Sequence, residues 1–103
     1  MPPATRGADL QWIEDLVERS GKPESWLFFA EYLQNHSRLG PALSAAQRAA
    51  TLMPEDPWSH SRISQILALR GDLDGARAAA RKAVALSRDA PIFRVLLQKL
   101  EAK

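Results

Sequence analysis

The sequence predicts an all-α protein made of repeated helical hairpins, and three observations support this prediction. Apolar residues recur three, four or seven positions apart, which is the spacing of one face of a helix. Three prolines, Pro23, Pro57 and Pro91, recur at a constant interval along the chain. Short segments rich in Gly, Pro, Ser and Asp interrupt the apolar pattern, and no segment shows the alternation of a strand. We therefore expect six helices and no sheet.

The ends of the expected helices are marked mostly by glycines and prolines. Gly21 ends the first helix, and Pro23 suits the first turn of the second, where its missing N–H costs nothing. Gly71 can adopt the left-handed conformation that ends the fourth helix, and Asp72 can cap the fifth. After a disordered lead-in at 1–7, the helices are expected at about 8–19, 23–35, 39–52, 58–70, 72–87 and 91–101.

The expected helices carry apolar residues at helical spacing. Trp12 lies to one side of the stripe in the first helix, and Phe28 and Tyr32 widen the stripe in the second. The stripes consist of Leu10, Ile13, Leu16 and Val17 in the first helix, Trp26, Phe29, Ala30 and Leu33 in the second, and Ile92, Val95, Leu96 and Leu100 in the sixth.

The composition is typical of one small soluble domain. The chain has 103 residues, of which 46% are hydrophobic and 25% charged. It contains no cysteine, which excludes disulfides and thiolate metal sites. No apolar run has the length of a signal peptide or a membrane-spanning helix, so we expect a cytoplasmic protein without a membrane partner. The net charge of +2 is too small to indicate nucleic-acid binding.

An internal repeat follows from the proline spacing. Residues 23–56 can be laid over residues 57–90 without a gap. Both segments then share a break at the same place, which composition alone does not explain. The identical pairs are Pro23/Pro57, Ser25/Ser59, Leu33/Leu67, Leu39/Leu73, Ala42/Ala76, Ala45/Ala79, Ala46/Ala80, Ala49/Ala83 and Leu52/Leu86.

In the spacing and type of these residues, the sequence resembles the tetratricopeptide repeat (TPR) family, whose unit is a helix–turn–helix of about 34 residues. The first unit departs from the family pattern at the Ser37-Arg38 turn, and the second departs at His60 and Arg88. The matching residues are Trp26, Phe29, Ala30, Leu33, Ala42, Ala46, Ala49 and Pro54 in the first unit, and Ile63, Ser64, Leu67, Gly71, Asp72, Ala76, Ala80 and Ala83 in the second.

The resemblance implies a right-handed α-α superhelix forming a single domain over residues 8–103. Its complete repeats would be 23–56 and 57–90, flanked by helices at 8–20 and 91–101. Two complete units are fewer than the usual minimum of about three. We therefore expect the ends of the stack to be completed by self-association or by other domains.

The residue types and motifs that form catalytic or metal sites in other proteins do not form such a site in this sequence. The two histidines, His36 and His60, have no accompanying metal ligands, and we expect His60 to be a satisfied, partly buried ring. The segment 71–75 resembles a calcium loop but lacks its length and its bidentate Glu. There is no phosphate-binding loop and no nucleophile elbow. We expect no catalytic residue, metal or cofactor.

The resemblance also implies a binding groove, because the first helix of each TPR unit lines a concave face. Trp58 would either anchor a ligand there or pack on the linker at 54–57. Of the positions that clamp a terminal carboxylate in some family members, only Arg62 is suitable, which disfavours such a clamp. The expected groove residues are Glu24, Leu27, Glu31, Gln34, Asn35, Trp58, Ser61, Arg62, Gln65, Ala68, Leu69, Ile92, Val95 and Lys99.

The function that the sequence favours is a non-catalytic module for protein–protein interaction or assembly, which binds a peptide or a partner helix. One alternative is an accessory docking or oligomerisation domain of a larger enzyme or secretion component. A homo-oligomer formed through the terminal helices is compatible with both. The less favoured alternative is a nucleic-acid-binding solenoid, suggested by the basic residues around the fifth helix. Those residues are Arg70, Arg77, Arg81, Lys82 and Arg88.

Overall fold

The computed structural model describes the backbone of residues 6–102 and the side chains of residues 11–102. Within that part of the chain it contains six helices and no strand, so the predicted fold class is confirmed. The helices are α1 (Arg6–Ser20), α2 (Pro23–Asn35), α3 (Leu39–Leu52), α4 (Pro57–Leu69), α5 (Leu73–Leu86) and α6 (Pro91–Glu101).

The main difference in helix bounds concerns the first helix. It begins at Arg6, two residues before the expected start at Ala8, so Arg6 and Gly7 do not belong to a lead-in. The rest of the predicted disordered lead-in, residues 1–5, lies outside the described residues, as does the side chain of Leu10. Helices α2, α3 and α6 have the predicted bounds.

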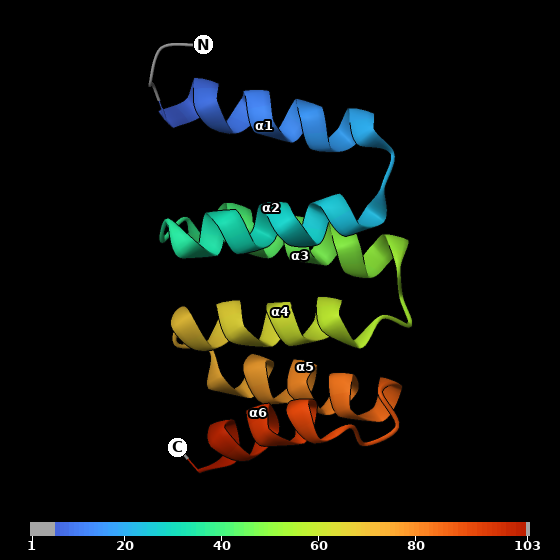
Figure 1. Ribbon diagram of the computed structural model, residues 1–103. Coiled ribbons are helices and arrows are strands. Elements are labelled where there is room, and N and C mark those ends of the chain that lie inside the picture. Colours follow the sequence, from blue (N-terminus) through green and yellow to red (C-terminus); the bar gives the residue numbers. More distant parts are fainter. Residues whose placement is uncertain (1–5, 103) are drawn as a thin grey trace.

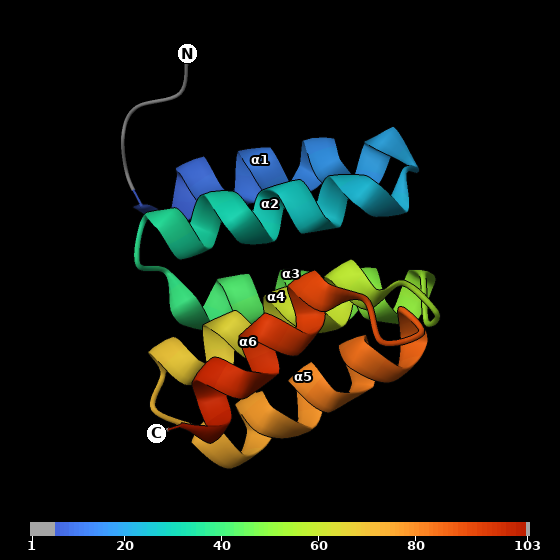
Figure 2. The ribbon, with the colours of Figure 1, turned by 60° about the horizontal axis from the view of Figure 1, so that its bottom comes forward.

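The helices stack in chain order, each antiparallel to the next (Figure 1). The result is a slab of 43 × 27 × 17 Å, with α1 and α6 at opposite ends. Helices α2 and α3 form one hairpin, and α4 and α5 form the second. Figure 2 shows α6 lying against the second hairpin. The leading helices α2, α4 and α6 run in the same direction and lie side by side.

Small residues hold the two helices of each hairpin close together. Ala30, Ala42 and Ala46 are fully buried between α2 and α3, and such short side chains allow a close approach of the two backbones. In the second hairpin, Ser64 occupies the position equivalent to Ala30. Its hydroxyl donates a hydrogen bond of 2.7 Å to the carbonyl oxygen of Ala76, so this buried polar group is satisfied.

The turns confirm the predicted roles of Gly71 and Asp72. Gly71 has a φ of +87°, and the Asp72 carboxylate accepts a hydrogen bond of 2.9 Å from the Gly75 amide. Ser37 lies at the equivalent place in the first hairpin and has a φ of +60°. A serine therefore adopts there the left-handed conformation that suits glycine.

The buried face of α6 differs from the predicted stripe. Phe93 and Leu100 are buried, whereas Ile92 and Val95 are 57% and 47% exposed. Leu96 and Leu100 do pack in the core, against α5. The predicted set of apolar positions lacked Phe93, which α6 turns toward Trp58 on α4; Ile92 and Val95, which the sequence also assigned to the groove, face outward.

Candidate interaction surface

The leading helices α2, α4 and α6 lie side by side (Figures 1 and 2), and we call the surface formed by their predicted groove residues the groove face. The repeat places equivalent residues of successive helices in rows across it. One row is Glu31, Gln65 and Lys99, so its charge changes from negative through neutral to positive. A segment lying across the three helices would contact the members of such a row in turn.

Arg62 orders the centre of the groove face. Its guanidinium donates to the side-chain oxygens of Gln34 at 2.8 Å and of Gln65 at 3.3 Å. It also lies 3.6 Å from a carboxylate oxygen of Glu31. The arginine therefore ties α4 to α2 and fixes both glutamine side chains. Because their oxygens accept from Arg62, the NH₂ group of Gln34 and the second N–H of Gln65, whose first N–H donates to Ser61, are the donors available to other partners.

A cavity of about 360 Å³ lies where α2, α4 and α6 end. Its walls are mainly apolar, and Leu69 is 60% exposed at its rim. Two amides and one ammonium group complete the lining. This combination suits an apolar side chain of a ligand whose neighbouring backbone or side-chain groups are polar. The lining residues are Gln34, Gln65, Ala68, Leu69, Leu96, Lys99 and Leu100.

Trp58 lies at the opposite end of the groove face and is 54% exposed. Its ring packs edge-on against Phe93, with the ring centroids 4.9 Å apart and the planes at 70°. The indole is thus held by α6, whereas sequence reasoning considered only the 54–57 linker as a packing partner. Ile92 lies one repeat after Trp58, and Val95 lies one repeat after Ser61. Both residues of α6 are exposed.

The predicted groove residues all lie on α2, α4 and α6, and all of them except Ser61 are at least partly exposed. Ser61 is only 4% exposed, and its hydroxyl accepts a hydrogen bond of 3.4 Å from the Gln65 amide. It therefore supports Gln65 more than it faces a ligand. Sequence reasoning also omitted two residues of the cavity wall, Leu96 and Leu100. The signal was available, because Leu96 lies one repeat after Arg62, which was included.

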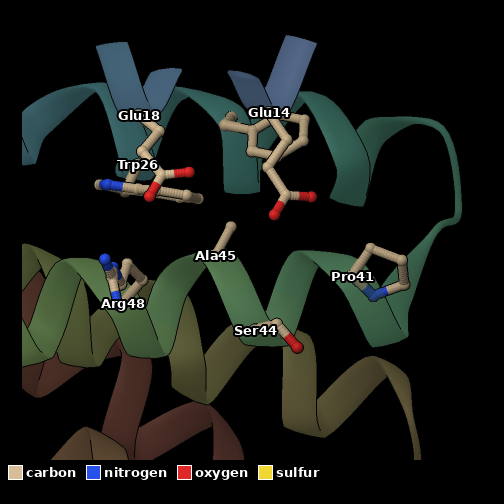
Figure 3. Close-up of a pocket in the computed structure, with 8 residues that line it drawn as sticks. Glu14, Glu18, Trp26, Pro41, Ser44, Ala45 and Arg48 are labelled. Atoms are coloured by element: carbon tan, nitrogen blue, oxygen red, sulfur yellow. The ribbon is translucent and has the colours of Figure 1, made fainter. Parts of the chain in front are cut away.

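A second cavity, of about 480 Å³, opens between α1, α2 and α3 and was not foreseen. Figure 3 shows Glu14 and Glu18 directed from α1 toward α3, with Trp26 and Arg48 at one end. The Arg48 guanidinium lies 5.6 Å from the centre of the Trp26 ring, a cation–π contact. The cavity shows that α1 packs on α2 without closing onto α3.

The remaining polar candidates have structural partners. His60 is 9% exposed, and its Nε2 lies 3.4 Å from the carbonyl oxygen of Pro54. Arg77 donates to the Leu100 carbonyl oxygen at 3.2 Å, and Arg81 lies 3.6 Å from Glu101. These two arginines of the predicted basic region therefore hold α6 against α5. Among residues 11–102, no three His, Asp or Glu side chains are grouped as metal ligands.

Helix bounds, repeat and groove face together define a TPR-like helical-repeat fold. No protein-family model and no curated protein matches the sequence. Among solved structures, that of PcrH in complex with the chaperone-binding region of PopD is similar, with a TM-score of 0.66. The match covers 99% of this chain and 92% of the PcrH chain at 18% sequence identity, which shows a common fold. None of the helices in residues 6–102 is long and apolar enough to cross a membrane.

Proposed function

We propose that this chain is a non-catalytic binding module, which holds a segment of a partner protein against the groove face. The observation that carries the proposal is the cavity at the ends of α2, α4 and α6, beside the glutamines that Arg62 fixes. The fold shared with PcrH supports it, because that protein was solved with a region of PopD bound.

The groove face offers a ligand two apolar contacts at opposite ends. The cavity beside Leu69 would accept one apolar side chain, and the exposed Trp58 would pack against a second. Between them, the amides of Gln34 and Gln65 would donate to carbonyl oxygens of the bound segment. Because Arg62 already orders these amides, less side-chain entropy is lost when the ligand binds.

Selection from a displayed library of random peptides tests this proposal for any partner sequence. We expect the selected peptides to carry two separated apolar residues and to bind the wild-type chain. Leu69→Asp should weaken their binding at least tenfold, because it places a charge at the rim of the apolar cavity. Trp58→Ala should weaken it by a smaller factor.

Lys82→Ala is the matched control, because Lys82 is exposed on α5, outside the groove face. This variant should bind the selected peptides as the wild type does. If the peptides bind Leu69→Asp and Trp58→Ala with unchanged affinity, their site lies elsewhere and the groove assignment is wrong.

A further inference from the structure

Four large apolar side chains are exposed together at the N-terminal end of the stack. Trp12 and Leu16 on α1 are 52% and 48% exposed, and Phe28 and Tyr32 on α2 are 71% and 44% exposed. The two helices are antiparallel neighbours joined at Gly21. Leu16 and Phe28 are about equally far from that turn in sequence, and so are Trp12 and Tyr32. In antiparallel helices, the two members of each pair therefore lie at about the same level along the helices. We call these four residues the N-terminal apolar face.

The repeat shows what normally covers such positions. The residue one repeat after Trp12 is Ala46, which is fully buried against α2, the leading helix of its hairpin. The residue one repeat after Tyr32 is Ile66, which is fully buried against the preceding hairpin. Helix α1 thus has the register of a trailing helix, and no described residue supplies the leading helix that would pair with it.

The N-terminal end of the stack is acidic, which favours a basic partner over a second copy of this chain on the N-terminal apolar face. The described side chains of α1 and α2 include one base, Arg19. Asp15 lies one helical turn from Trp12, and Glu24 lies one turn from Phe28, so acids border the apolar residues. A second copy facing the first would bring the same acids together. Among the described side chains of these two helices, the acids are Glu14, Asp15, Glu18, Glu24 and Glu31.

We propose that the N-terminal apolar face binds an amphipathic helix of a partner protein, with an apolar stripe and basic edges. The bound helix occupies the place that the leading helix of this unit would take and packs against Trp12 and Phe28. Its basic side chains lie beside Asp15 and Glu24. The four apolar residues of this site are not among the groove residues, although Glu24 at its edge is, and the proposal does not depend on the function proposed for the groove face.

Two synthetic peptides, each about 15 residues long so that a helix can form, test the inference by fluorescence anisotropy with the full chain. Both have the same leucine and alanine stripe, and the edge positions are lysine in one and glutamate in the other. We expect the lysine peptide to bind at least tenfold more tightly, and its affinity to fall as salt is added. Phe28→Ser should weaken its binding at least tenfold, whereas Leu69→Ser in the groove should leave it unchanged.

Phe28 is 71% exposed, so Phe28→Ser should keep the helicity and thermal unfolding of the wild type, and circular dichroism checks this. Equal affinity for the two peptides would overturn the proposal, and so would loss of binding in Leu69→Ser alone. Light scattering gives a third decisive outcome. A wild-type dimer that Phe28→Ser converts to monomer would make this face a contact between copies instead.

Discussion

The two ends of the helical stack have opposite surfaces. At the C-terminal end, α6 is a leading helix with no described trailing helix, and its open face carries Arg94, Gln98 and Glu101, all exposed. The equivalent positions on α2 are Trp26, Ala30 and Leu33, which pack in the core. At the N-terminal end, the open face carries large apolar residues instead. Terminal repeats of a stack carry a polar outer face, and among the described residues α6 has such a face whereas α1 and α2 expose large apolar side chains.

The largest expected change in stability distinguishes two leucines, one buried in the core and one exposed at the N-terminal end of the stack. Leu33 is fully buried, so Leu33→Ala should lower the free energy of unfolding by about 2–5 kcal/mol. Leu16 is 48% exposed at the uncovered end, so Leu16→Ala should cost less than about 1 kcal/mol. Urea unfolding measures both. Similar losses in the two variants would mean that α1 is covered in solution.

Overpacking the covered equivalents of Trp12 should have an intermediate effect. Ala46 and Ala80 have no exposed surface, so Ala46→Leu or Ala80→Leu should destabilise the chain by roughly 1–3 kcal/mol. Thermal melts of the two variants report the change. Ala78→Leu on the exposed side of α5 serves as the control and should melt with the wild type. Wild-type melting of both core variants would contradict the repeat register.

The smallest effect on stability is expected from removing the polar cap at the other end. In the double variant Arg94→Leu and Gln98→Leu, the open face of α6 becomes apolar while the core stays intact. The free energy of unfolding should change by less than about 0.5 kcal/mol. Size-exclusion chromatography should nevertheless show self-association at concentrations where the wild type shows none. A variant that elutes as the wild type does would argue against a capping role for α6.

The sequence predicted the helices well because their boundaries depend on local chemistry. Pro57 and Asp72 act within one helical turn, so their effects can be read without knowing the fold. The rotation of α6 was harder to predict, since most residues in its first two turns are apolar and several stripes fit. The side of α6 that becomes buried is set by the contact between Phe93 and Trp58, and these two residues lie about one repeat apart in the chain.

The candidate site could be predicted in part. The repeat placed the groove residues on the leading helices, because equivalent positions recur once in every unit. It did not predict the cavity, which forms only where three separate helices end together. Nor did it predict that Arg62 would donate a hydrogen bond to Gln34, a residue of the preceding helix pair. Both features depend on distances between units, which the sequence pattern does not contain.

The stacking of the helices in chain order has a consequence for folding. Each helix packs mainly against its neighbours in sequence, so loop closure costs little and the hairpins can form one after another. Opening should also proceed from the ends. Helix α1 contacts essentially only α2, and its amide hydrogens should exchange earlier than those of α4 and α5. A helix bound beside α1 would slow this exchange, and in that sense the last step of folding would be completed by another protein.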